Sequence, residues 1–236
     1  MKILIYEDKR FYWKEKDFQT QYGVLKEKDI KKAKSGTFIK THLNKKFLVL
    51  DALFIDEIKK IKRGPAIILP KDIGLILTLT GINKESTCLE AGSGSGYLTA
   101  YLANFCKKIY SYERKKEFYK LTKKNLEFLN IKNVILKNKD VYKKIEEKNL
   151  DLIVLDLPEP WNALSNVKKS LKSSHFLVCY LPTITQVIKL TKSLNGFIHE
   201  KTLELIEREW QTDLRRLRPK SQIIGHTGFI IFLRKI

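Results

Sequence analysis

The pattern of hydrophobic and polar positions changes close to residue 66. Before that point the chain carries short runs in which apolar and polar residues alternate, such as KILIYE and FYWKEK, and glycines separate them. Alternation with a period of two is typical of strands that bury one face, and glycine marks turns. Residues 1–66 are therefore predicted to form a small β-rich domain.

Residues 67–236 have the pattern of a larger α/β domain. Apolar runs alternate there with amphipathic segments such as KKEFYKLTKKNLEFL and TITQVIKLTKSL; the runs are STCLEA, KKIYSYE, NVILK, DLIVLDL and HFLVCYLP. This alternation predicts a doubly wound parallel sheet. Two further runs, GFIHEKTLELIEREW and QIIGHTGFIIFLRK, have no convincing helix between them, which predicts a terminal antiparallel hairpin.

The chain is strongly basic, with 46 Lys and Arg against 26 Asp and Glu and a formal net charge of +20. Such an excess favours polyanions through the release of counterions, so nucleic acid is the predicted class of partner. A surface adapted to heat would carry matched acids, which this chain lacks. No apolar run reaches the ~18 residues of a membrane span, and the N-terminus has no leader pattern, so a cytoplasmic protein without membrane contact is expected.

Three cysteines, Cys88, Cys106 and Cys179, lie far apart in apolar segments. An odd number without close spacing fits neither a disulfide framework nor a CxxC-type metal site. Buried, reduced thiols and no bound metal are therefore expected.

The stretch CLEAGSGSGYLTAYL places three glycines between a strand run and a helical segment. Parallel sheets bind ligands at such a turn, because bare backbone approaches the ligand closely and the next helix offers unpaired amides. A dinucleotide fingerprint would need glycine where Tyr97 stands, while Glu90 disfavours a diphosphate and suits a cationic amine. A nucleotide-like cofactor is predicted; a purely structural glycine turn is the alternative.

Acidic residues also follow the next two strand runs. Glu113 stands 21 residues after Gly92 (113 − 92), close to the offset at which an acidic side chain accepts hydrogen bonds from ribose hydroxyls. Asp140 follows the third run, where it would accept from the exocyclic amine of an adenine or, alternatively, cap a helix.

Together these motifs resemble those of class I S-adenosylmethionine-dependent methyltransferases, and within them the tRNA (adenine-N1)-methyltransferases of the T-loop. The resemblance covers nearly the whole chain and rests on RGPAIILPKDIGLIL, LEAGSGSGYLT, SYE, LDLPEPW and LRPKSQIIGHTGFIIFLRK. It implies a Rossmann-like seven-stranded sheet, S-adenosylmethionine as cofactor, and tRNA adenine 58, sometimes also 57, as target. It also implies a homotetramer. The chain departs from the family in being short and in carrying Pro158 where many members have an apolar residue.

The motifs and the resemblance assign candidate residues. Asp156 is the candidate catalytic residue, because methylation at N1 makes adenine cationic and a carboxylate beside N1 stabilises that charge. The candidate cofactor-binding residues are Glu90, Gly92, Ser93, Gly94, Gly96, Tyr97, Leu98, Glu113, Arg114, Asp140 and Asp156. Lys71, Asp72 and Trp161 are candidates for the substrate pocket, with an exposed helix start and a core position as alternatives. Gln186 and His226 match recurrent family positions and receive no catalytic role.

The candidate RNA-binding residues lie in REWQTDLRRLRPK and are Arg208, Arg215, Arg216, Arg218 and Lys220. A target base inside folded RNA must be extruded, and its backbone must be held, so phosphate contact is a natural role for these cations. A merely solvated loop is the alternative. The N-terminal domain, with KEKDIKKAKSG, is expected to add a second basic surface.

Three other functions fit parts of the pattern. A methyltransferase of the same fold could act on a corrinoid precursor or on protein isoaspartate, but neither substrate calls for the basic charge. A non-catalytic RNA-binding subunit would not need the intact glycines and Asp156.

Overall fold

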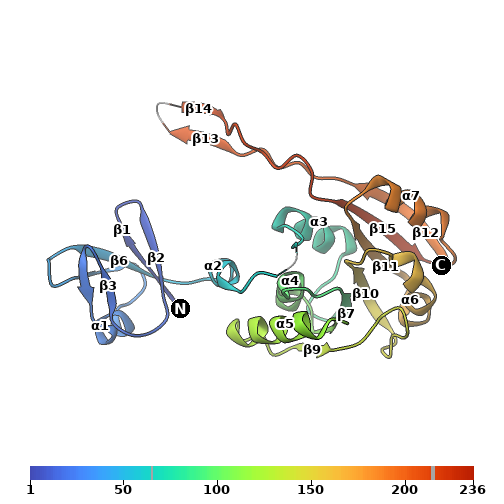
Figure 1. Cartoon of the computed structure of the whole chain (residues 1–236), viewed down its shortest axis with the longest axis horizontal. Helices are drawn as coiled ribbons and strands as arrows, with labels where there is room; N and C mark the ends of the chain where they lie inside the picture. Colours follow the sequence, from blue (N-terminus) through green and yellow to red (C-terminus); the bar gives the residue numbers. More distant parts are fainter. Residues whose placement is uncertain (65, 214–215) are drawn as a thin grey trace. The chain divides into compact units, whose positions relative to one another are not determined.

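The computed structural model describes residues 1–64, 66–213 and 216–236 (Figure 1). Contacts within the chain divide it into two compact units, Met1–Ile61 and Lys62–Ile236. The change of pattern in the sequence comes slightly later, at residue 66. Arg215, one of the predicted RNA-binding residues, lies outside the described residues.

The first unit is a small β-structure, as predicted. Its antiparallel sheet has the order β2–β1–β6–β5, formed by β1 (Lys2–Tyr6), β2 (Lys9–Trp13), β5 (Thr37–Lys40) and β6 (Lys46–Asp51). A two-stranded ribbon, β3 (Phe18–Thr20) with β4 (Gly23–Leu25), and the short helices α1 (Glu27–Lys32) and α2 (Phe54–Glu57) complete it. Leu4, Trp13 and Phe47 lie at the centre of its buried core.

The second unit contains the predicted seven-stranded sheet, in the order β12–β15–β11–β10–β7–β8–β9. The strands are β7 (Thr87–Ala91), β8 (Lys108–Tyr112), β9 (Val134–Lys137), β10 (Leu150–Leu155), β11 (Leu171–Leu181), β12 (Phe197–Leu203) and β15 (Phe229–Lys235). Strands β7 to β11 are parallel to one another, whereas β15 is antiparallel to both β11 and β12. The sheet with its terminal antiparallel pair is therefore confirmed.

Helices cover both faces of this sheet because neighbouring strand residues point to opposite sides. Leu152 and Val154 pack with α3 (Pro70–Thr80) and α4 (Tyr97–Phe105) in one core. Ile153 and Leu155 pack with α6 (Leu164–Ser170) and α7 (Ile184–Lys192) in the other. The fifth helix of the layers, α5 (Lys116–Phe128), joins β8 to β9.

The order of the strands reverses between β7 and β10. After β7 the chain adds β8 and β9 on one side, and it then crosses back to place β10 and β11 on the other. In a doubly wound sheet a crevice opens beyond the carboxyl ends of the strands at such a reversal. The glycine loop follows β7 directly, so the fold brings it to this crevice.

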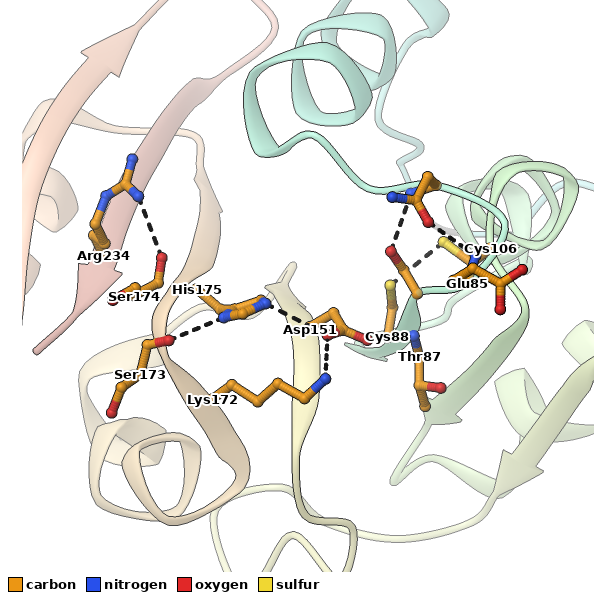
Figure 2. Close-up of polar contacts among 12 residues, drawn as sticks. Glu85, Thr87, Cys88, Cys106, Asp151, Lys172, Ser173, Ser174, His175 and Arg234 are labelled. Carbon is orange, nitrogen blue, oxygen red and sulfur yellow. Dashed lines mark hydrogen bonds and ion pairs between the residues drawn. The ribbon is translucent and has the colours of Figure 1, made fainter.

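At the opposite edge of the sheet, Asp151 links the beginnings of three strands (Figure 2). Its carboxylate accepts hydrogen bonds from the backbone N–H of Thr87 at 2.7 Å and from Lys172 Nζ at 2.5 Å. His175 Nε2 lies 3.4 Å from the same carboxylate. Burial of Asp151 disfavours its charge, but the bonds from Lys172 and Thr87 outweigh this effect and lower its pKa. These contacts lie at the starts of the strands, away from the crevice at their carboxyl ends.

All three cysteines are free and buried, as predicted. The thiols of Cys88 and Cys106 lie 3.4 Å apart between β7 and the end of α4 (Figure 2). Within the described part of the chain, no cluster of three or more His, Cys, Asp or Glu side chains is arranged to hold a metal ion. No helix among the described residues has the length and apolar character needed to cross a membrane.

The connection between β12 and β15 differs from the loop expected from the sequence. It contains a second, smaller hairpin in which β13 (Trp210–Asp213) pairs antiparallel with β14 (Arg216–Pro219). The alternation in these short strands is hidden because charged residues stand among the apolar ones and most of the side chains are exposed. Trp210 in β13 and Leu217 in β14, both large apolar residues, are 56% and 77% exposed.

Candidate active site

A cavity of about 330 Å³ lies at the carboxyl ends of β7, β8 and β10. Most of the predicted cofactor-binding residues line it: Glu90, Gly92, Ser93, Gly94, Tyr97, Leu98, Glu113, Arg114, Asp140 and Asp156. Gly96 does not line the cavity and instead begins α4 as its N-cap residue. The geometry thus brings together acids that the sequence could place only at the ends of separate strands.

Glycine is required in this loop by close packing as well as by backbone conformation. Gly92 has φ +95°, and a Cβ atom there would lie 2.1 Å from the carbonyl oxygen of Asp156. The backbone N–H of Asp156 donates to the carbonyl of Ala91 at 3.0 Å, which holds the ends of β10 and β7 together. At Gly96, with φ +78°, a Cβ atom would lie 2.9 Å from Thr122 Cγ2 on α5.

Glu90 is a buried carboxyl at the end of β7, with 1% of its surface exposed. It accepts hydrogen bonds from Thr99 Oγ1 at 2.5 Å and from Ser111 Oγ at 3.1 Å. Burial raises the pKa of Glu90 to about 7; the two hydroxyls oppose this shift, and the charges of Asp156 and Glu113 add to it. A cation in the cavity would therefore be attracted to Glu90 and would favour its ionised form.

Glu113 and Asp140 both contact the backbone beside the cavity. The carboxylate of Glu113 accepts from the N–H of Gly94 at 3.1 Å and from the N–H of Lys115 at 2.8 Å, so it supports the glycine loop. An ionised carboxylate has about four acceptor sites, which leaves Glu113 capacity for the predicted ribose contact. Asp140 accepts from the N–H of Tyr142 at 2.9 Å within a turn, so no helix follows for it to cap.

Asp156 lies half-buried at the end of β10, on the cavity lining. Burial raises the pKa of its carboxyl to about 7. The loop that follows is stiffened, since Pro160 begins a short 3₁₀ helix and the side chain of Gln186 donates to the carbonyl of Pro158 at 2.9 Å. Gln186, on α7, thus has a positioning contact to the Asp156 loop that the sequence did not indicate.

Trp161 lies in the 3₁₀ helix that begins at Pro160, and it does not line the cavity. It is half-buried, packs against the core on the α6 and α7 face, and has Lys189 Nζ 4.3 Å from its ring centroid. The structure therefore gives Trp161 packing contacts with the core, which was the alternative to a position in the substrate pocket.

Lys71 and Asp72 form a buried ion pair at the start of α3, with Lys71 Nζ 2.8 Å from Asp72 Oδ1. The hydroxyls of Tyr180 and Thr227 donate to Asp72 Oδ2 at 3.2 and 2.9 Å. Lys71 also donates to the carbonyl of Leu205 at 2.6 Å. The pair is thus not an exposed helix start; it ties α3 to both ends of the β12–β15 connection and lies off the cavity lining.

His226 lies at the same connection. Its ring nitrogens contact the carboxylate of Glu204 at 2.5 Å and the carbonyl of Pro182 at 2.8 Å. Glu204 raises the pKa of His226. These contacts indicate a structural role for His226. The residue does not line the cavity.

The described RNA-binding candidates are exposed cations on the β13–β14 hairpin and its flanks: Arg208, Arg216, Arg218 and Lys220. Lys220 forms an ion pair with Glu209 at 2.7 Å. Nothing in these contacts assigns a ligand, so their role stays a prediction.

Other residues complete the lining and were not identified from the sequence. They are Ala66, Ile67 and Ile68 before α3, Ala91 and Tyr112 at the ends of β7 and β8, Ser95 in the glycine loop, Lys115 and Phe118 at α5, and Lys139, Val141, Tyr142, Leu157 and Pro158 after the strands. The residues adjoining Arg114, Asp140 and Asp156 could have been predicted from the sequence, because residues next to a strand end lie at the same edge of the sheet. Ile67 and Phe118 could not, since periodicity along a chain does not show which distant apolar side chains meet.

The residues of the cavity fit S-adenosylmethionine. This cofactor carries a sulfonium and an ammonium group, and the cavity holds the carboxyls of Glu90, Glu113 and Asp156, which would attract both. Its ribose offers hydroxyl donors to carboxylates, and Ile67 and Phe118 offer apolar contact to its adenine. A diphosphate would be repelled by the same acids. The fold and the cavity define a class I S-adenosylmethionine-dependent methyltransferase.

Comparison with known proteins gives the family. Residues 60–224 match the family described as "tRNA methyltransferase complex GCD14 subunit". Over 268 residues the chain is 38% identical to tRNA (adenine(57)-N(1)/adenine(58)-N(1))-methyltransferase TrmI of Methanocaldococcus jannaschii, with 99% of this chain and 94% of the relative covered. The chain belongs to this family of tRNA methyltransferases, which confirms the resemblance found in the sequence.

Two solved structures are similar over the full chain. The tRNA (m1A58) methyltransferase TrmI from Aquifex aeolicus has a TM-score of 0.84 at 31% identity, with 100% of this chain and 96% of that chain covered. An S-adenosylmethionine-dependent O-methyltransferase from Thermotoga maritima has a TM-score of 0.88 at 30% identity, with 100% and 92% covered. Both similarities confirm the class I methyltransferase fold.

We expect S-adenosylmethionine to bind about tenfold more weakly at about pH 6 than at about pH 7.5. The pKa of Glu90 is raised to about 7, so this carboxyl is mostly protonated at the lower pH and ionised at the higher one. Only the ionised form attracts the sulfonium and ammonium groups. Titration calorimetry at both pH values measures the change.

Glu90→Gln is the control for this prediction, because it keeps the size of the side chain and cannot ionise. It should bind the cofactor weakly and with a flatter pH dependence than the wild type. Wild-type affinity that stays constant, or that rises toward the lower pH, would contradict the attraction between Glu90 and the cofactor.

Proposed function

We propose that this chain transfers the methyl group of S-adenosylmethionine to N1 of an adenine in the T-loop of tRNA. The observation that carries the proposal is the carboxyl of Asp156, which lines the cofactor cavity at the end of a central strand. The cofactor supplies an electrophilic methyl group on a sulfonium centre. The protein has to hold the base in line with that group and to stabilise the charge that the base acquires.

Asp156 suits the second task. Adenine N1 attacks with its own lone pair, so no general base is needed, but the methylated base is cationic at neutral pH. A carboxylate next to N1 and the N6 amine accepts a hydrogen bond from the amine and stabilises the positive charge. Because burial raises the pKa of Asp156 to about 7, a cationic product beside it would favour its ionised form.

The net charge of the chain and the names of its relatives support tRNA as the substrate. The chain has a net charge of +20, which suits RNA and which neither a corrinoid precursor nor a protein isoaspartate requires. The M. jannaschii relative is named for adenines 57 and 58 and the A. aeolicus structure for adenine 58, so position 58, with 57 as a second target, is proposed here. The cavity with its glycine loop and Asp156 argues against a non-catalytic subunit.

Two further parts of the proposal rest on the family resemblance. The homotetramer is one of them; phosphate contact by the cations of the β13–β14 hairpin and by the N-terminal unit is the other, and it rests also on their positive charge. The exposure of Arg208, Arg216 and Arg218 supports the second.

Methylation of tRNA transcripts tests the proposed function. The chain is incubated with methyl-labelled S-adenosylmethionine and an unmodified transcript, and the RNA is digested to nucleosides. Label is expected in 1-methyladenosine. A transcript with guanosine at position 58 and one with guanosine at position 57 assign the target, and a transcript with both replaced is the control. Label in another nucleoside, or none in a transcript that binds, would contradict the proposal.

A further inference from the structure

A cluster of exposed cations borders the cofactor cavity on the side of β8 and β9. We define these rim cations as Arg114, Lys115, Lys116, Lys139, Lys143 and Lys144, all of which are exposed. Four of them line a cleft of about 540 Å³ together with Asn138, Asp140 and Glu146. The cleft shares Arg114, Lys139 and Asp140 with the cofactor cavity, so the two spaces adjoin.

Nearby acids neutralise only part of this charge. Glu146 binds Lys137 at 3.0 Å and also pairs with Lys139. A carboxylate oxygen of Asp140 accepts the backbone N–H of Tyr142. Among the described residues, no carboxylate forms an ion pair with Arg114, Lys143 or Lys144. The cleft therefore keeps a local excess of positive charge.

Cofactor binding does not account for Lys116, Lys143 and Lys144, which do not line the cofactor cavity. S-adenosylmethionine itself would carry a net positive charge, so further cations beside its cavity would not attract it. Arg114, Lys115 and Lys116 also stand at the start of α5, where the helix dipole makes positive charge unfavourable. The cluster thus opposes both the cofactor's charge and local helix stability, which an anionic ligand in the cleft would offset.

We propose that the rim cations bind phosphates of the tRNA backbone close to the adenine that enters the cavity; this inference rests on the proposed function. Strands β8, β9 and β10 are parallel, so the rim cations and Asp156 lie at the same edge of the sheet. An RNA strand that delivers a base to Asp156 has to come close to that edge, where the cleft adjoins the cavity. Flexible lysines suit this task, since they meet phosphates without fixed geometry.

The test compares two pairs of lysines of equal charge. The variant Lys143→Ala/Lys144→Ala removes two rim cations. The control Lys84→Ala/Lys107→Ala removes two exposed lysines from the loops that precede β7 and β8, at the opposite edge of the sheet. The ion pair of Lys107 within the described residues is with the distant, exposed Glu85 at 3.9 Å, so the loss of Lys107 should cost little stability.

Transcript binding is measured by fluorescence anisotropy at several salt concentrations. For the rim variant we expect affinity to fall about tenfold and the slope of log affinity against log salt to decrease by about two, one for each lost phosphate contact. Its KM for tRNA should rise while kcat at saturating tRNA stays unchanged. The control should match the wild type, and the Tm increase caused by S-adenosylmethionine should be the same in all three proteins.

The inference would be overturned by a rim variant with wild-type affinity and salt slope, or by an equal loss in both variants. Failure of the proposed function is seen separately, as a wild-type chain that binds transcripts but leaves no 1-methyladenosine in them. A rim variant that loses affinity without any change in salt slope would also count against phosphate contact, because loss of a charge contact must change that slope.

Discussion

The Asp156→Asn variant is expected to turn over about two to three powers of ten more slowly than the wild type. Asparagine keeps the size of the side chain and its place at the end of β10, but it loses the negative charge that stabilises a cationic adenine. Asp156→Ala should be at least as slow. Single-turnover methylation at saturating S-adenosylmethionine and tRNA measures the chemical step without a contribution from binding.

Asp151→Asn is the matched control, because it makes the same chemical change at the other end of the same strand, away from the cavity. It should keep a turnover close to that of the wild type. The Tm increase caused by S-adenosylmethionine should survive in both variants, and tRNA binding should change little because backbone contacts dominate affinity. A near wild-type rate for Asp156→Asn would mean that positioning alone explains the catalysis.

The sheet could be predicted because its strands are buried and continuous. Runs such as DLIVLDL have the length of a buried strand and are too short for a typical helix, and the absence of a convincing helix between the last two runs pointed to an antiparallel pair. The β13–β14 hairpin was missed for the opposite reason. Its strands are short and mostly exposed, and β14 alternates arginine with other residues, so no buried face imposes a recognisable pattern on the sequence.

The site was predictable in the glycine loop and where a residue stands close to a strand end. Glu90, Glu113, Asp140 and Asp156 share that feature, and the parallel sheet collects them at one cavity. Lys71 shows the limit. Its partners include Leu205 and Thr227, and no local pattern connects residues so far apart in the chain. The contact of Gln186 with the Asp156 loop was hidden in the same way.

The Gly92→Ala variant is expected to lose the Tm increase caused by S-adenosylmethionine and to lose at least two powers of ten in turnover. At φ +95°, alanine is strained, and its Cβ would lie 2.1 Å from the carbonyl oxygen of Asp156. This oxygen belongs to the backbone at the end of β10, so it cannot rotate away as an atom of a flexible side chain could. The ends of β7 and β10 must separate, which moves both the glycine loop and the carboxyl of Asp156.

Gly81→Ala separates this clash from the cost of the backbone conformation. Gly81 also has a positive φ, +67°, but among the described residues outside its own chain neighbourhood no atom lies within 4 Å of an added Cβ. The substitution should cost about 1 kcal/mol of stability through conformation alone and keep the cofactor-induced Tm increase, because α3 ends there and Gly81 does not line the cavity. If Gly92→Ala behaved like Gly81→Ala, with cofactor binding and turnover retained, the close approach of β7 and β10 would not be what shapes the cofactor cavity.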